Sequence, residues 1–212
     1  MVNKDWTGNS TSVYANLAAS NHSEEDRADK DYYATPPFAV EELLKRESFN
    51  HYILEPAVGG GHIAEVLKAH GHKVQCMDIT DRGYPGTQVK DFFTATKDDL
   101  ICSPDIISNA PYSMATEFVE HALDISMDSV KVAMLLKIQF LETKKRYDLF
   151  KKYPPKKIYV FVNRINCGKN GEFGTESSAV CYAWFVWEKG YDGLPQIDWI
   201  CSDPIRKAKR LF

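Results

Sequence analysis

Short apolar runs alternate with amphipathic segments along most of the chain, and this alternation is the strongest constraint on its fold. The apolar runs lie at residues 52–54, 73–77, 105–108 and 130–136, and the segments with helical periodicity lie at 37–46, 63–69 and 115–123. Apolar strands that alternate with helices are typical of a mainly parallel sheet covered on both faces. We therefore predict a doubly wound, Rossmann-like α/β fold, in which two late β-rich runs at 157–162 and 179–187 supply an antiparallel edge strand.

The length and composition of the chain are those of one globular unit. With 212 residues, of which 44% are hydrophobic, a single domain is expected at 29–212. Residues 1–28 are rich in Asn, Ser and Thr and predict a polar extension that precedes this domain. Within the domain, a short basic insertion is expected at about 141–178.

The cysteine and histidine patterns argue against disulfide bonds and metal sites. The five cysteines form no CxxC pair and the six histidines form no HExxH motif, so we expect reduced thiols and no bound metal. No apolar run has the length of a membrane span, and the polar start of the chain lacks the features of a secretory signal. These patterns predict a cytoplasmic protein without a membrane partner.

A glycine-rich turn, Glu55–Gly61 (EPAVGGG), follows the first predicted strand of the alternating region. Glycines in such a turn let a ligand approach the backbone closely. The turn is not a dinucleotide fingerprint, because Ala64 stands where the third glycine would be, and it lacks the Lys-Ser/Thr pair of a phosphate-binding loop. The carboxylate of Glu55 would repel a pyrophosphate but would hold the ammonium group of an amino-acid moiety. These features favour S-adenosyl-L-methionine as the cofactor.

Two acidic positions further along the chain fit an adenosine-type ligand. Asp78 follows the second strand, 17 residues after Gly61, near the spacing at which an acidic residue accepts hydrogen bonds from ribose hydroxyls. Asp91 and Phe92 add a carboxylate and an apolar face suited to the amino group and ring of an adenine. Taken singly, Asp78 is equally well explained as a turn residue and Phe92 as part of the core.

The tetrapeptide Asn109-Ala110-Pro111-Tyr112 follows the strand at 105–108 and is the most informative motif in the chain. An amino group conjugated to a ring is a poor nucleophile until acceptors hold its hydrogens and free its lone pair. The side-chain oxygen of Asn109 and the carbonyl oxygen of Ala110, fixed by the proline that follows, are suited to be those acceptors. Tyr112 offers a ring on which a flipped-out base can stack.

In this order the motifs resemble those of small phage- or prophage-type adenine-N6 DNA methyltransferases, over about residues 31–200. The resemblance implies a class I S-adenosylmethionine-dependent methyltransferase fold, a phage-encoded protein acting in a bacterial host, and S-adenosylhomocysteine as the product of the cofactor. The family's catalytic motif, (N/D)-P-P-(Y/F), falls on Asn109, Ala110, Pro111 and Tyr112. The cofactor contacts that the resemblance implies are Tyr33, Thr35, Pro36, Glu55, Pro56, Gly59, Gly61, Asp78, Ile79, Asp91, Phe92 and Asn109.

Two departures from the family pattern bear on function. Ala110 replaces the first proline of the catalytic motif, which loosens the backbone slightly but leaves both acceptors in place. Only 100 residues follow Tyr112, too few for the large target-recognition domain of restriction-type enzymes. We therefore expect short or weak readout of the target sequence.

Basic residues gather in one part of a chain whose formal net charge is −3. Between residues 137 and 169 there are ten basic residues against two acidic ones, which predicts contacts with the phosphates of a nucleic acid, most simply DNA. A solvated helix face explains part of the same pattern. The residues that we expect to contact nucleic acid are Lys137, Lys144, Lys145, Arg146, Lys151, Lys152 and Lys169.

The catalytic motif suits any planar amine, so two other targets stay open. These are an amino group of RNA and the amide of a protein glutamine. A non-catalytic relative that binds nucleic acid is the alternative to an enzyme.

Overall fold

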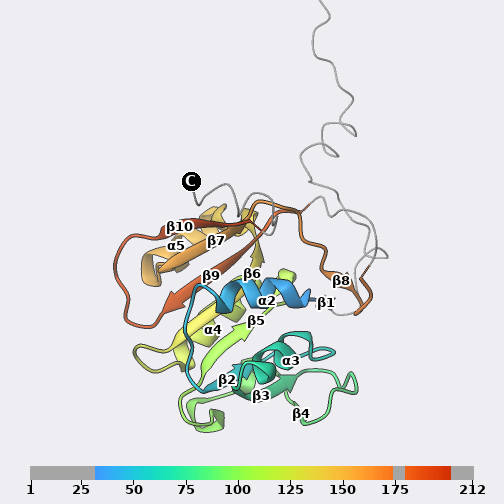
Figure 1. The fold of residues 1–212 in the computed structure, drawn as a ribbon. Coiled ribbons are helices and arrows are strands. Elements are labelled where there is room, and N and C mark those ends of the chain that lie inside the picture. Colours follow the sequence, from blue (N-terminus) through green and yellow to red (C-terminus); the bar gives the residue numbers. More distant parts are fainter. Residues whose placement is uncertain (1–31, 174–179, 202–212) are drawn as a thin grey trace, which may run out of the picture.

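The central sheet of the protein is seen in a computed structural model that describes residues 32–173 and 180–201 (Figure 1). In this part of the chain the sheet has eight strands in the order β10-β7-β9-β6-β5-β2-β3-β4. Their bounds are β2 (Tyr52–Glu55), β3 (Lys73–Asp78), β4 (Thr87–Val89), β5 (Asp105–Ser108), β6 (Lys131–Lys137), β7 (Lys157–Phe161), β9 (Tyr182–Glu188) and β10 (Gln196–Ile200). Only β9 runs antiparallel to its neighbours. The predicted mainly parallel α/β sheet is confirmed.

The antiparallel strand lies inside the sheet, which corrects the expected position at its edge. β9 pairs with β6 on one side and β7 on the other, and β10 forms the edge beside β7. The reason is burial: β9 is buried along Tyr182–Trp187, whereas four of the five residues of β10 are exposed. β7 pairs with both β9 and β10 and so belongs to the sheet, although its residues fall inside the basic insertion predicted at about 141–178.

Helices cover both faces of the sheet. α2 (Pro37–Leu44) and α3 (His62–Ala69) contribute Leu43 and Leu67 to the core on one face, together with Trp184 of β9. The indole N–H of Trp184 donates a hydrogen bond of 2.8 Å to the carbonyl of Ala39 and so ties α2 to the sheet. α4 (Ala115–Ile125) and α5 (Lys144–Lys152) cover the other face.

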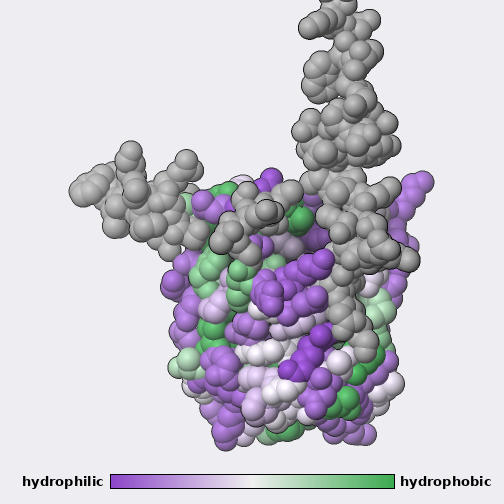
Figure 2. Space-filling model, turned by 90° about the vertical axis from the view of Figure 1, so that its right-hand side faces the viewer, coloured by the Kyte–Doolittle hydropathy of each residue, from purple (hydrophilic) through white to green (hydrophobic). Residues whose placement is uncertain are grey.

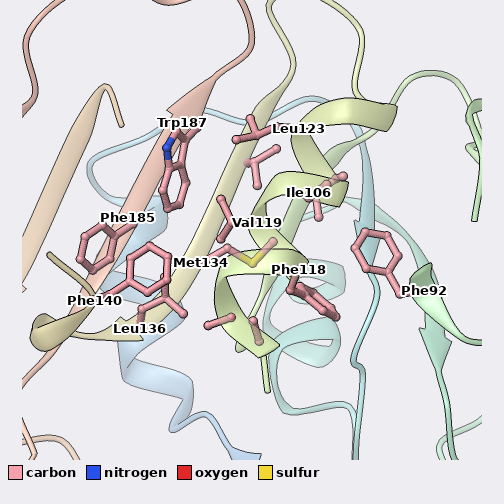
Figure 3. Close-up of a cluster of buried hydrophobic side chains, with 14 of the residues drawn as sticks. Phe92, Ile106, Phe118, Val119, Leu123, Met134, Leu136, Phe140, Phe185 and Trp187 are labelled. Atoms are coloured by element: carbon pink, nitrogen blue, oxygen red, sulfur yellow. The ribbon is translucent and has the colours of Figure 1, made fainter. Parts of the chain in front are cut away.

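The core beneath α4 is rich in aromatic and branched side chains (Figure 3). Phe118, Val119 and Leu123 of α4 pack on Met134 of β6, while Phe185 lies further along the same face. Successive residues of β6 and β9 alternate between the two faces, as the pleat of a strand requires. Apolar residues at every position of these strands are thus explained by burial on both sides.

A small antiparallel ribbon stands apart from the main sheet and was not predicted. It pairs β1 (Tyr33–Ala34) with β8 (Gly168–Lys169), with Tyr33 opposite Lys169 and Ala34 opposite Gly168. Strands of two residues leave no periodic signal in a sequence. The ribbon lies at the right of Figure 1, and Figure 2 shows that side of the molecule, where hydrophilic residues predominate.

The remaining short elements are one-turn 3₁₀ helices: η3 (Phe92–Thr94), η4 (Lys97–Asp99), η5 (Tyr112–Met114) and η6 (Ile138–Leu141). The polar extension predicted at 1–28 lies outside the described residues, as does Ala179, the first residue of the last predicted run. Within the described ranges, no helix has the length and apolar character of a membrane span.

Candidate functional site

A cavity lies at the carboxyl ends of β2, β3 and β5, three parallel strands that are neighbours in the sheet. Ligands of doubly wound sheets bind at this edge, because the loops after parallel strands meet there. Ten residues that the sequence indicated for the site line the cavity: Tyr33, Thr35, Glu55, Pro56, Asp78, Ile79, Asp91, Phe92, Asn109 and Pro111. They come from five segments of the chain.

The five other residues that the sequence indicated for the site, Pro36, Gly59, Gly61, Ala110 and Tyr112, do not line the cavity. Pro36 precedes the first turn of α2. Gly59 and Gly61 have φ of +54° and +84°, a backbone conformation that other residues rarely adopt, and a Cβ at Gly59 would meet the Tyr32 ring at 2.3 Å. Ala110 is buried in the core beneath α4, and Tyr112 is half-buried against the core on the other face of the sheet.

Glu55 ends β2 as a buried carboxyl group at the floor of the cavity. Its side chain is 1% exposed, and its Oε2 atom has no hydrogen-bond partner among the described residues. Burial raises the pKa of the Glu55 carboxyl well above its ordinary value, and the nearby Asp78 raises it further, while a hydrogen bond from the backbone of Ala64 opposes this. A cationic group in the cavity would stabilise the ionised form.

Asp78 ends β3 and orders the loops around it. Its Oδ2 atom accepts a hydrogen bond of 2.8 Å from the backbone N–H of Gly59, and its Oδ1 atom accepts one of 2.9 Å from Thr80. A carboxylate has about four acceptor sites, so each oxygen keeps room for a further donor. Asp78 therefore holds the glycine turn in shape and still presents acceptors to the cavity that it lines.

Asn109 follows β5 and carries the first residue of the tetrapeptide into the cavity. Its Nδ2 atom donates a hydrogen bond of 2.6 Å to the main-chain carbonyl of Tyr33. A carbonyl oxygen can only accept a hydrogen bond, so the NH₂ group of the Asn109 amide must face Tyr33 and the amide oxygen must face away from it. The Oδ1 atom is buried and has no partner among the described residues.

Three side chains that line the cavity thus carry buried polar atoms with no partner in the described part of the chain: Oγ1 of Thr35, Oε2 of Glu55 and Oδ1 of Asn109. Buried polar atoms are paired in the great majority of cases, and each exception calls for an explanation. Bound molecules with donors at several points, one of them cationic, would satisfy these atoms. The residues present therefore fit the ammonium group and hydroxyls of S-adenosylmethionine.

The far end of the cavity is aromatic, and part of it was not foreseen. Phe92 is 3% exposed and packs on Phe118 at 4.6 Å between ring centroids, so its side chain belongs to the core as well as to the lining. Phe93 lines the cavity as well. Asp91 also lines it, and its Oδ1 atom accepts a hydrogen bond of 3.0 Å from the backbone N–H of Phe93 at the start of η3. Ile79 is 58% exposed at the rim.

Sequence reasoning missed several lining residues: Tyr32, Ala57, Val58, His62, Ile63, Arg82, Phe93, Met114 and Phe118. Phe93 had a signal, since it adjoins the Asp91-Phe92 pair. Tyr32 and Arg82 had none, because they meet only through the fold, with the guanidinium carbon 4.4 Å from the centre of the Tyr32 ring.

The ring of Tyr112 already has neighbours on three elements. Its centroid lies 5.3 Å from that of Tyr33, and its hydroxyl donates a hydrogen bond of 3.1 Å to the hydroxyl of Tyr182. Lys137 places its ammonium 4.5 Å from the ring centre. Behind this group lies Cys167, whose thiol pKa is raised by burial to about 12.

The predicted nucleic-acid contacts divide into two groups along the structure. Lys137 lies beside Tyr112, Lys169 lies in the ribbon opposite Tyr33, and Lys144 begins α5 directly after the loop that follows β6. Lys151 and Lys152 lie at the other end of α5. The main-chain carbonyl of Tyr153, which follows this helix, accepts a hydrogen bond from the indole of Trp187, and Trp187 pairs with Val132 near the start of β6. This end of α5 therefore lies at the opposite end of β6 from the cavity.

Two other basic side chains of α5 are bound to neighbouring groups. Lys145 forms an ion pair with Glu117. Arg146 donates hydrogen bonds of 2.8 and 3.2 Å to the carbonyls of Gln139 and Glu142 and so closes the preceding turn. The basic cluster in the sequence is therefore partly structural.

No protein-family model and no curated protein matches the chain by sequence. Solved structures do match its fold. A protein of Listeria monocytogenes assigned to the class I S-adenosylmethionine-dependent methyltransferases aligns with a TM-score of 0.55 at 15% identity, over 95% of this chain and 74% of its own. A predicted O-methyltransferase of Agrobacterium tumefaciens aligns with a TM-score of 0.57 at 12% identity, over 82% of this chain and 94% of its own.

A third similar structure is the 23S rRNA methyltransferase ErmE, with a TM-score of 0.54 at 14% identity, over 78% of this chain and 72% of its own. At these identities the likeness concerns the fold. The mainly parallel sheet with helices on both faces agrees with that likeness. The chain has the Rossmann-like fold of the class I S-adenosylmethionine-dependent methyltransferases.

Proposed function

We propose that this chain is a methyltransferase that transfers a methyl group from S-adenosylmethionine to the N6 amino group of adenine in DNA. The observation that carries the proposal is a pair of buried acceptors at the cavity, the Oδ1 atom of Asn109 and the Oε2 atom of Glu55, neither of which has a partner within residues 32–173 and 180–201. The first atom is an acceptor for an amine to be methylated, and the second is an acceptor for the ammonium group of the cofactor.

The lining residues divide the work of holding the cofactor, which when bound supplies a methyl group activated by a sulfonium centre. Glu55 binds the ammonium group, and Asp78 accepts hydrogen bonds from the ribose hydroxyls. Ile79 and Phe93 pack on the adenine ring, and Asp91 accepts from its amino group. All five residues line the same cavity.

Asn109 and Ala110 prepare the substrate amine for attack. The Oδ1 atom of Asn109 and the carbonyl of Ala110 accept its two hydrogens, so the nitrogen lone pair is freed from the ring. This lone pair forms the new N–C bond as the S–C bond breaks, and the surplus proton of the amine passes to solvent. Electrostatic preorganisation and proximity supply the rate, without a strong base.

The base must leave its stack to reach this site. Tyr112 offers the stacking surface, and a base that lies on its ring displaces the ammonium of Lys137 toward the phosphates. Lys137, Lys144 and Lys169 then hold the strand at the edge of the cavity. These contacts fix position without reading sequence.

The test is transfer of labelled methyl groups to unmethylated duplex DNA, to RNA and to a protein extract in parallel, followed by nucleoside analysis. The expected product is N6-methyladenine in DNA. Asn109→Ala should lower the rate by about 10²–10³-fold, the size of effect seen when one preorganised hydrogen-bonding group is removed. Gln196→Ala, at the exposed edge strand β10, is the matched control and should leave the rate unchanged.

RNA is the second candidate substrate, because a structural neighbour is an rRNA methyltransferase and basic residues barely distinguish the two nucleic acids. Labelled methyl groups in RNA alone would show that the same mechanism acts on RNA. Absence of label in all three pools, with cofactor binding intact, would refute the proposed activity.

A further inference from the structure

The amide of Asn109 is held in one orientation by a part of the chain 76 residues away. Its Nδ2 atom is 2.6 Å from the carbonyl oxygen of Tyr33, while its Oδ1 atom is buried without a partner among the described residues. Rotation of the amide by half a turn would place two acceptors against each other and turn the NH₂ group toward the cavity. The carbonyl of Tyr33 therefore discriminates between the two orientations.

The segment that carries this carbonyl is itself fixed on two sides. On one side it pairs with β8, and the backbone N–H of Asn170 donates a hydrogen bond of 3.0 Å to the carbonyl of Tyr32. On the other side the Tyr32 hydroxyl accepts a hydrogen bond of 2.9 Å from the backbone of Gly60. The Tyr33 carbonyl thus has a defined place relative to both the glycine turn and the catalytic loop.

We infer that Tyr33 is a positioning residue, whose main-chain carbonyl selects the orientation of Asn109 that offers an acceptor to the substrate amine. The inference rests on the proposed function and goes beyond it in one respect. The resembling family accepts Asn or Asp at this position, whereas this chain requires a side chain that both donates and accepts. The ribbon of β1 and β8 is in this sense part of the catalytic site.

Replacing the amide by a carboxylate tests the inference directly. In Asn109→Asp an ionised side chain would bring an oxygen against the Tyr33 carbonyl at the position of Nδ2. The carboxylate would then rotate or shift, and its second oxygen would lose its place at the cavity. A protonated carboxyl group has one O–H donor, so protonation restores the contact with Tyr33 and leaves the other oxygen as the acceptor.

The measurement is the ratio of kcat for Asn109→Asp to kcat for the parent between pH 6 and pH 8.5, on whichever substrate the parent methylates. We expect the variant to be about 10–100-fold slower at pH 8, the range expected for a lost buried hydrogen bond. The ratio should rise as the pH falls, since the carboxyl group then gains its proton. Asn109→Ala, which can neither donate nor accept, should give a low ratio at every pH.

Two kinetic results would overturn the inference while leaving the proposed function intact. One is an Asn109→Asp variant as active as the parent at pH 8. The other is a ratio that is low and independent of pH, as in the alanine variant. Thermal unfolding and cofactor affinity of each variant show that the protein is folded in these comparisons.

A second readout does not depend on activity. The side-chain NH₂ signals of Asn109, identified in ¹⁵N spectra by their loss in Asn109→Asp, should show one proton protected from exchange with solvent. Rapid exchange of both protons would overturn the positioning role, whatever reaction the protein performs. Protection in a protein that transfers no methyl group would instead count against the proposed function alone.

Discussion

Glu55 places a buried carboxyl group in the lining of the cavity. Its buried carboxyl group has one unpartnered oxygen, and the nearby charge of Asp78 opposes its ionisation further. Such a group costs stability in the ligand-free protein and becomes useful when a cation binds. Cofactor affinity and the stability of the empty protein are thus opposed at this position.

We predict that Glu55→Gln stabilises the ligand-free protein and weakens cofactor binding. The pKa of the Glu55 carboxyl group is raised in the folded state. The contribution of this group to the free energy of unfolding is therefore complete below its ordinary pKa of 4.5 and is lost as the pH rises through the raised pKa. The gain in Tm for the variant should therefore be larger at pH 8 than at pH 5, by roughly 2–4 °C for each kcal/mol.

Calorimetric scans at the two pH values, and titration with S-adenosylmethionine, measure these effects. Glu142→Gln is the control, because that side chain is exposed at the start of the loop before α5. A parent as stable as Glu55→Gln at both pH values would show that the carboxyl group is not strained by its burial.

At the scale of elements, the glycine turn between β2 and α3 is shaped by contacts as well as by backbone conformation. Gly59 has φ of +54° and lies against the ring of Tyr32, while its N–H donates to Asp78. Gly71, after α3, has φ of +86°, and a Cβ there would meet no atom within 4 Å. The two positions share the backbone requirement but differ in their surroundings.

We predict that Gly59→Ala and Gly71→Ala each destabilise the protein by about 1–2 kcal/mol, because both place a side chain at positive φ. Only Gly59→Ala should also weaken cofactor binding, since its Cβ displaces Tyr32 from the cavity wall. Urea unfolding and calorimetric titration separate the two effects. Equal cofactor affinity in both variants would refute a role for the contact with Tyr32.

Elements whose residues are buried in a clear pattern were predicted well, and very short or mostly exposed ones were not. The expected strand at 105–108 coincides with β5, and the expected helix at 63–69 differs from α3 by one residue. Amphipathic and apolar patterns report burial directly, which explains this agreement. β4 and the ribbon of β1 and β8 are too short to show such a pattern, and four of the five residues of β10 are exposed.

At the scale of the whole molecule, α5 runs from the edge that bears the cavity toward the opposite end of the strands. Lys144 begins this helix next to the loop that follows β6, and Lys151 lies near its end. Both side chains are exposed. They carry the same charge on the same helix at different distances from the proposed active site, so they form a matched pair.

We predict that Lys144→Ala lowers nucleic-acid affinity and reduces the slope of log K against log salt by about 1, as expected for one lost phosphate contact. Lys151 was expected from the sequence to contact nucleic acid, but its place in the last turn of α5 leads us to predict that Lys151→Ala changes neither quantity. Fluorescence anisotropy titrations at several salt concentrations give both slopes. Equal losses in the two variants would mean that binding depends on the overall charge of the helix.

The sequence by itself determined the fold class and the motifs, because burial periodicity and turn chemistry are properties of neighbouring residues. It also indicated half of the cavity lining, since residues that follow parallel strands must meet at one edge of the sheet. Only the tertiary structure decided which buried acceptor atoms of the motifs have no hydrogen-bond partner among the described residues. The carbonyl of Tyr33 and the amide of Asn109 are brought together by the packing of distant segments, and no local pattern records that contact.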